Sequence, residues 1–167
     1  MDKVVTNDER VPDPKVLVFL DCDGVLNSNV DFIRCKGEID PLNPGAVALF
    51  KEIQEDMNCT VVLSSTWRMH LEAIQKLRDH GIHVDQRTPV TGYGRGKEIT
   101  EFLELYCKIR GLHPRQLKIA IIDDDISDIV SEEYLKPDVF KTDMQNGGLT
   151  NHIASQVRRH LKGEWTW

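Results

Sequence analysis

The sequence has no long apolar run, and no stretch approaches the roughly 18 consecutive apolar residues that a membrane-spanning helix needs. Residues 1–14 are charged, contain prolines and lack the apolar segment of a secretory signal. We therefore predict a soluble, cytoplasmic protein with no membrane partner. A flexible leader at 1–14 should precede one domain at 15–162 and a short tail at 163–167, whose tryptophans we expect to pack against the domain.

The four cysteines form no CxxC pair, and the histidines show no spacing typical of metal ligands. This pattern favours reduced thiols in a cytosolic setting. Internal repeats and low-complexity segments are also missing, and the hydrophobic content of 40% argues against wholesale disorder. The composition is that of an ordinary globular domain.

An excess of positive charge is missing as well, because the formal net charge is −6. Such a charge repels a polyanion over long range but does not exclude one. A local basic rim can still form from Arg34, Lys36, Arg68, Arg87, Arg95 and Lys97. Nucleic acid therefore stays open as a partner.

Short apolar runs alternate with segments of helical periodicity, which predicts an α/β fold with a doubly wound, mostly parallel sheet. The predicted strands span residues 16–20, 60–63, 82–84, 117–122 and 139–140. The predicted helices span residues 44–57, 67–80, 97–110 and 149–161, the first of them with Asn43 as its N-cap. Residues 85–96, rich in glycine and proline, are predicted to form a flexible turn.

Polar residues follow three of the predicted strands. Asp21 and Asp23 come after the first strand, Ser64 after the second, and an acidic run at residues 123–128 after the fourth. Ligands of open parallel sheets bind at the carboxyl ends of the strands, so these residues should share one edge. Asp-x-Asp-Gly alone also fits an ordinary turn, and it is the joint occurrence that favours a functional site.

Carboxylates gathered at one edge repel one another by about 4 kcal/mol for two unit charges roughly 4 Å apart at an effective dielectric constant near 20. A cation must offset this repulsion, and oxygen ligands without His or Cys suit Mg²⁺. Lys97 opens a predicted helix, where a cation is unfavourable with respect to the helix dipole and needs another reason. Acids, a metal ion and a lysine together indicate phosphoryl transfer.

These residues resemble the four motifs of the haloacid dehalogenase (HAD) superfamily, in the family's order. The stretch 19–27 resembles motif I, Val62-Leu-Ser64 motif II, Lys97 motif III and the stretch 121–128 motif IV. The resemblance spans about residues 15–160 and implies a Rossmann-like HAD core with phosphatase activity. The stretches 64–68 and 95–99 are further similar to small capless members, including HAD domains of RNA-repair proteins.

The resemblance also implies roles for individual residues. Asp21 is the expected nucleophile, which forms an aspartyl-phosphate, and Asp23 is the expected general acid and base. Ser64 and Lys97 complete the expected catalytic set, because they would bind a phosphoryl oxygen and offset negative charge. The expected substrate-binding residues are Ser64, Ser65, Arg68 and Lys97.

The resemblance implies Mg²⁺ as the cofactor. Its expected ligands are Asp21, the backbone carbonyl of Asp23 and an acid of motif IV, for which the family pattern favours Asp124, with Asp123 as the alternative. Asp128 is expected to lie behind the ligands as a supporting partner. An aspartate at position 23 fits the phosphatases of the superfamily, whereas its ATPases usually carry threonine there.

The segments 27–43 and 85–96 are too short to fold into the cap domain that often confers substrate selectivity in this superfamily. A capless site is open, which the family associates with bulky phosphorylated substrates such as a phosphoprotein or a nucleic-acid end. A small-molecule substrate covered by a partner subunit stays open as an alternative.

Two other classes of protein are compatible with an acidic sheet edge. A signalling receiver is also phosphorylated on aspartate, but it places its acidic pair first and its lysine near the end. The order in this sequence is the reverse, with the largest acidic cluster after Lys97. A non-catalytic binding module is the other alternative, against which the full set of acids argues.

Overall fold

Five parallel strands form one sheet in the order β3-β2-β1-β4-β5. The computed structural model describes residues 10–164, so the predicted packing of Trp165 and Trp167 lies outside the described residues. The strands are β1 (Asp13–Leu20), β2 (Cys59–Leu63), β3 (Gln86–Arg87), β4 (Lys118–Asp123) and β5 (Val139–Lys141). The predicted α/β fold is confirmed, and every strand pair is parallel.

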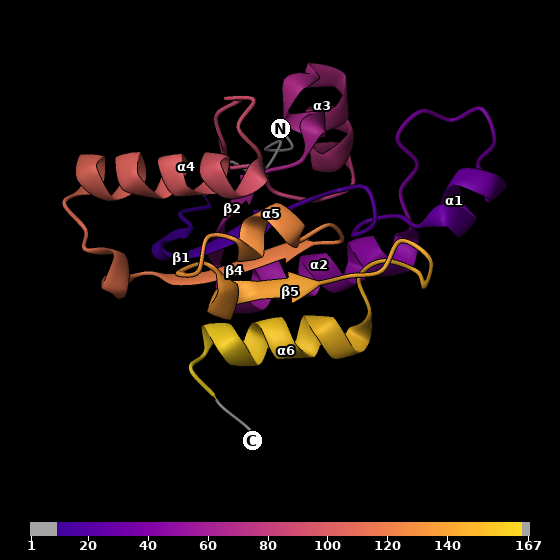
Figure 1. Cartoon of the computed structure of the whole chain (residues 1–167). Coiled ribbons are helices and arrows are strands. Elements are labelled where there is room, and N and C mark those ends of the chain that lie inside the picture. The colour runs from indigo at the N-terminus through magenta and orange to yellow at the C-terminus, as the bar shows by residue number, and fades with distance from the viewer. Residues whose placement is uncertain (1–9, 165–167) are drawn as a thin grey trace, which may run out of the picture.

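Helices cover both faces of this sheet, with α2 and α6 on one face and α4 and α5 on the other (Figure 1). The α-helices are α1 (Asn29–Arg34), α2 (Pro44–Met57), α3 (Leu71–Asp79), α4 (Arg95–Arg110), α5 (Ser127–Val130) and α6 (Asn151–Leu161). Short 3-10 helices are η1 (Thr66–Met69), η2 (Pro114–Gln116) and η3 (Lys136–Asp138). Within residues 10–164 no helix has the length and apolar content needed to cross a membrane.

The central strand β1 explains the two cores. Val18 and Leu20 point to one side and join a core with α2 and α6, whereas Leu17 and Phe19 join a second core with α4. Side chains of a strand alternate between faces, so a run of apolar residues without alternation predicts a strand covered on both sides. Residues 17–20 are fully buried, as that argument requires.

Local capping fixes the helix that follows motif I. Asn43 accepts a hydrogen bond from the backbone N–H of Ala46, and Pro44 occupies the first helical position, where its missing N–H has no consequence. The predicted bounds of this helix, residues 44–57, are confirmed.

The predicted third strand is wrong. Residues 82–84 are not a strand; the strand is Gln86–Arg87, which pairs with Val62 and Leu63. Ile82 and Val84 are buried in the hydrophobic core although they belong to no strand. Apolar content alone could not distinguish such a buried connection from a strand.

The structure has two separate elements, η1 and α3, in place of the predicted helix over residues 67–80. His70 has extended backbone between η1 and α3, and Leu71, which was expected to face the core, is 78% exposed. The predicted leader is also too long, because β1 begins at Asp13 and Thr60 donates a hydrogen bond to the backbone carbonyl of Asp13.

No large cap domain interrupts the described residues. The segment between β1 and α2 contains only α1 and its loop, which stand apart from the two helical layers (Figure 1). Lys76 of α3 fixes this loop by an ion pair to Glu38 at 2.8 Å and a hydrogen bond to the Asp40 carbonyl at 2.7 Å. The carboxyl edge of the sheet therefore keeps only short segments around it.

Candidate active site

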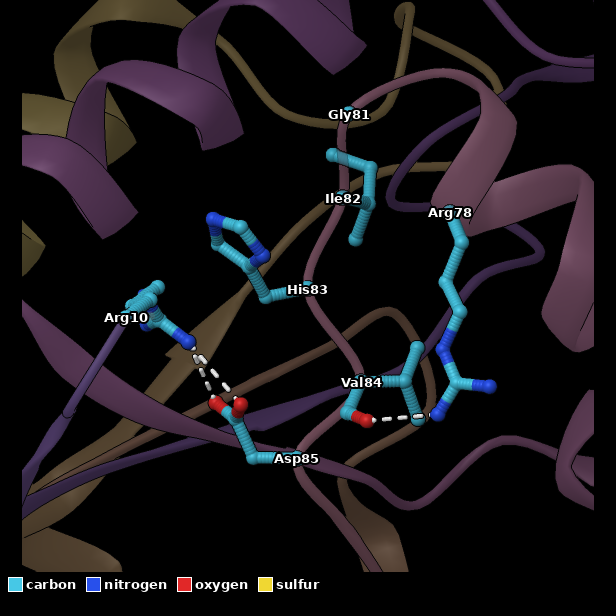
Figure 2. A pocket seen from close by; sticks show the side chains of 7 residues that line it. All are labelled: Arg10, Arg78, Gly81, Ile82, His83, Val84 and Asp85. Carbon is cyan, nitrogen blue, oxygen red and sulfur yellow. Dashed lines mark hydrogen bonds and ion pairs between the residues drawn. The ribbon is translucent and has the colours of Figure 1, made fainter. Parts of the chain in front are cut away.

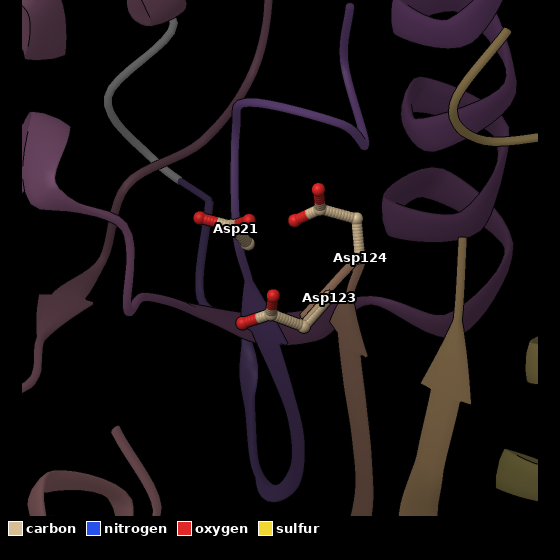
Figure 3. A group of neighbouring side chains, drawn as sticks. All are labelled: Asp21, Asp123 and Asp124. Atoms are coloured by element: carbon tan, nitrogen blue, oxygen red, sulfur yellow. The ribbon is translucent and has the colours of Figure 1, made fainter. Parts of the chain in front are cut away.

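Three carboxylates meet where β1 and β4 end, because these two strands are neighbours in the sheet. Asp21 follows β1, Asp123 is the last residue of β4, and Asp124 comes next (Figure 3). One carboxylate oxygen of each residue lies within 4.8 Å of the other two. The structure thus brings together Asp21 with both motif IV acids that were expected to compete for the metal.

Burial makes this cluster electrostatically unfavourable. Burial, together with the charge of Asp123, raises the pKa of Asp21 well above its ordinary value. Burial likewise raises the pKa of Asp123, although a neighbouring arginine acts in the opposite direction. An oxygen-only set of three carboxylates, two of them buried, is a donor set suited to a hard divalent cation.

Arg95, the first residue of α4, supplies the cation at this edge. Its Nη1 lies 2.6 Å from Asp123 Oδ2 and 3.2 Å from Asp21 Oδ1. Burial lowers the pKa of Arg95, but the two carboxylates outweigh it and raise the pKa above its usual range. The other oxygen of Asp123 accepts the backbone N–H of Asp125, so both oxygens of Asp123 are engaged.

Lys97, the expected motif III cation, is not brought to the acids, and this corrects the prediction. Its Nζ pairs with Glu132 at 2.6 Å, and its side chain is 63% exposed. Two residues along an α-helix correspond to a rotation of about 200°, so Arg95 and Lys97 face opposite ways. The sequence pattern predicted that this helix begins at Lys97, whereas it begins two residues earlier, at Arg95.

Asp128 holds the start of α4 in place. Its Oδ2 accepts the backbone N–H of Arg95 at 2.6 Å. A Cβ atom at Gly96 would lie 2.4 Å from the Asp128 carbonyl oxygen, so the close approach of α4 to α5 depends on this glycine. Asp128 therefore contacts the acidic cluster only through Arg95, which pairs with Asp21 and Asp123.

Ser64 follows β2 at the same sheet edge as Asp21, since its backbone N–H donates to the carbonyl of Leu20, the residue before Asp21. The Ser64 side chain is fully buried, and its hydroxyl has no hydrogen-bond partner among the residues that the structure describes. An unsatisfied buried hydroxyl costs about 1–3 kcal/mol. A ligand oxygen at this position would remove that cost.

Ser65 and Arg68, which were expected to bind substrate, form hydrogen bonds and an ion pair within the protein. Ser65 Oγ accepts the backbone N–H of Trp67 and caps η1. The guanidinium of Arg68 is buried and pairs with Glu98 at 2.8 Å. It also donates to backbone carbonyls of Ser64, Ser65, Thr88 and Pro89.

Asp23 accepts hydrogen bonds from two side chains that no sequence motif linked to it. Asn27 Nδ2 lies 3.0 Å from Asp23 Oδ1, and Trp67 Nε1 lies 3.3 Å from Asp23 Oδ2. Trp67 belongs to η1 and Asn27 to the loop after β1, so the contact with Trp67 depends on the fold. Cys22, between the two acids, is fully buried in the core.

A cavity of about 520 Å³ lies elsewhere, and none of the acids described above lines it (Figure 2). Its lining residues are Arg10, Arg78, Gly81, Ile82, His83, Val84 and Asp85. Arg10 Nη1 donates to both carboxylate oxygens of Asp85, and Arg78 donates to the Val84 carbonyl. The guanidinium groups of Arg10 and Arg78 thus both have partners within the protein.

A parallel α/β sheet whose central strand ends in an Asp-x-Asp pair, facing acids at the end of the next strand, defines a HAD-type core. The chain matches the model of the family described as "HAD domain in Swiss Army Knife RNA repair proteins" over residues 17–154, and it belongs to this family. The resemblance noted in the sequence is confirmed.

One solved structure, a hypothetical protein from Xanthomonas campestris, superposes with a TM-score of 0.50 at 19% identity. The match covers 90% of this chain and 84% of the other. At this identity the likeness supports the fold alone. A search of curated proteins gave no match.

Proposed function

We propose that the protein is a Mg²⁺-dependent phosphomonoester hydrolase that acts through an aspartyl-phosphate on Asp21. One observation carries this proposal: at the carboxyl edge, Asp21 pairs with a cation, Arg95, and the neighbouring strand ends in Ser64, whose buried hydroxyl has no partner. A nucleophile flanked by two groups that bind phosphoryl oxygens is suited to attack on phosphorus.

Asp21, Asp124 and the backbone carbonyl of Asp23 are the proposed metal ligands. Asp123 is assigned to Arg95 instead, because both of its oxygens already accept hydrogen bonds. Asp124 turns its carboxylate toward Asp21 (Figure 3). Bound Mg²⁺ would neutralise carboxylate charge and stabilise the negative charge of the transferring group.

The reaction proceeds in two displacements. A carboxylate oxygen of Asp21 attacks phosphorus while the bond to the leaving oxygen breaks, and Asp23 donates its proton to that oxygen. Asp23, now a carboxylate, takes a proton from water as the water oxygen attacks the phosphorus of the aspartyl-phosphate, and the bond between phosphorus and the Asp21 oxygen breaks. Inorganic phosphate leaves, and both aspartates return to their starting states.

Ser64 and Arg95 bind the phosphoryl oxygens during both displacements. The hydroxyl of Ser64 gains the partner that it lacks in the free protein. Arg95 can turn one of its five N–H groups from the carboxylates to an equatorial oxygen, where charge develops. Lys97 has no part in this scheme, because it pairs with Glu132.

A macromolecular phosphoester is the proposed substrate class. The short segments around the carboxyl edge support this, since they leave the site open to a bulky group. The description of the family as RNA-repair domains favours a nucleic-acid end over a phosphoprotein. The net charge of −6 means that any such end is bound by local groups and not by long-range attraction.

Release of phosphate from p-nitrophenyl phosphate tests the reaction. Activity should require Mg²⁺, disappear with EDTA and disappear in Asp21→Asn. Turnover that survives Asp21→Asn contradicts the assigned nucleophile, and a stable phosphorylated protein without turnover supports a receiver-like phosphoacceptor instead. A panel of phosphopeptides, nucleotides, oligonucleotide ends and sugar phosphates then ranks the substrate classes.

A further inference from the structure

We infer that Trp67 is a positioning residue that holds the carboxylate of Asp23 in the orientation needed to protonate the leaving group. This inference rests on the proposed function, and it assigns a task to a side chain far from Asp23 in the sequence. The indole Nε1 donates to Asp23 Oδ2 at 3.3 Å.

The two oxygens of Asp23 are held by two separate donors. Oδ1 accepts from Asn27 Nδ2 at 3.0 Å, and Oδ2 accepts from the indole of Trp67. Each carboxylate oxygen has two lone pairs, so one remains on each oxygen for the reaction. With a donor on each oxygen, rotation of the carboxylate about its last bond breaks both contacts, and the group stays in one orientation.

Both donors are themselves fixed. Trp67 is 2% exposed and packs in the core, and its backbone N–H is held by Ser65 Oγ at 3.2 Å. Asn27 is fully buried; its Oδ1 accepts the N–H of Gly24, and its Nδ2 also donates to the Pro41 carbonyl. A rigid support of this kind is what a group engaged in proton transfer requires.

A buried indole N–H needs some partner for stability alone, so the contact by itself does not establish a role in the reaction. The partner, however, is the one carboxylate that transfers the proton. A displacement of about 1 Å at a reacting group can lower the rate about 10²-fold. A structural role and a positioning role therefore predict different kinetics.

The test uses the dependence of the rate on the leaving group. Phenolate is a poorer leaving group than p-nitrophenolate, so phenyl phosphate needs the proton from Asp23 more. We compare kcat/KM for the two esters, with Mg²⁺ present, in the wild type, Trp67→Phe and Asp23→Asn. General acid catalysis contributes about 10²–10⁴-fold, so loss of one of the two orienting bonds should slow phenyl phosphate about tenfold more than p-nitrophenyl phosphate.

Controls separate positioning from packing. Ile74→Val trims the same core without touching Asp23, and it should slow both esters equally or not at all. Asp23→Asn should show the same selective loss as Trp67→Phe, only larger. If the thermal melt shows that Trp67→Phe does not fold, Trp67→Leu, which removes the same hydrogen-bond donor, is used as the test variant instead.

The outcomes are distinguishable. A selective loss on phenyl phosphate supports the inference, whereas an equal loss on both esters, or none, overturns it and leaves Trp67 a core residue. If the wild type hydrolyses neither ester nor any member of the substrate panel, the proposed function fails, and the inference fails with it.

Discussion

Arg95 and Lys97 offer a direct test of which cation serves the site, because they lie two residues apart in the first turn of α4. We predict that Arg95→Gln lowers kcat/KM for p-nitrophenyl phosphate about 10²–10³-fold. Lys97→Gln, which removes the same charge from the same turn, should change kcat/KM less than about threefold, since exposed pairs contribute little.

The size of the Arg95 effect follows from its contacts. Nη1 lies 2.6 Å from Asp123 Oδ2 and 3.2 Å from Asp21 Oδ1, and only 21% of the Arg95 side chain is exposed to solvent. A pair of charges at such a site contributes about 4 kcal/mol at an effective dielectric constant near 20. Each 1.36 kcal/mol corresponds to about tenfold in rate, so even partial compensation by bound metal leaves a loss of about 10²-fold.

The assay measures initial rates over a range of substrate and Mg²⁺ concentrations for wild type, Arg95→Gln, Arg95→Lys and Lys97→Gln. Arg95→Lys should be intermediate, because an ammonium is a point charge that cannot reproduce the fork of a guanidinium. Thermal melts confirm that each variant is folded. A large loss in Lys97→Gln together with near-normal activity in Arg95→Gln would refute the placement of these two side chains.

Three further predictions concern stability, metal and phosphate. Glu98→Gln should lower the free energy of unfolding in urea by about 3–5 kcal/mol, because it leaves the buried Arg68 guanidinium without its counter-charge; a loss below about 1 kcal/mol contradicts this. Mg²⁺ at 100 times its Kd should stabilise the protein by about 2.7 kcal/mol. Burial raises the pKa of Asp21, so the metal-free protein should lose stability as the pH rises from 3.8 through that raised pKa. The Mg²⁺-dependent shift in Tm should therefore be larger at pH 8 than at pH 5. Equal shifts at the two pH values argue against Asp21 as a ligand. Ser64→Ala should lower kcat about 10²–10³-fold while its Tm rises by at least about 2 °C, since the variant loses a buried hydroxyl that has no partner and costs about 1–3 kcal/mol; a large drop in Tm at normal kcat reverses the assignment.

The fold was largely predictable because its signals are local. The apolar run before Asp21 predicted a strand covered on both faces, and Asn43-Pro44 predicted the start of α2 to the residue. The wrong predictions concern residues whose burial does not match the secondary structure that their apolar pattern predicts. Ile82 and Val84 are buried in a connection, and Leu71 fits a helical stripe yet lies exposed after a break at His70.

The site was predictable only in part, for a different reason. The acids follow strands, and the ends of parallel strands converge, so topology brought Asp21, Ser64 and the motif IV acids together. Arg95, Trp67 and Asn27 reach the site from a helix end, a 3-10 helix and a loop. Their approach depends on rotation about helices and on loop packing, and one residue of error in the start of a helix rotates a side chain by about 100°.

Asp123 and Asp124 are neighbours in the sequence but differ in their surroundings. Asp123 ends β4, where its oxygens accept from Arg95 and from the Asp125 backbone. Asp124 lies one residue further, beside Gly24, where a Cβ atom would come within 2.3 Å of its Cγ. A side chain at position 24 would therefore displace Asp124 from Asp21. The glycine of the Asp-Cys-Asp-Gly stretch thus does more than turn the chain, since it leaves the space in which the Asp124 carboxylate can face Asp21.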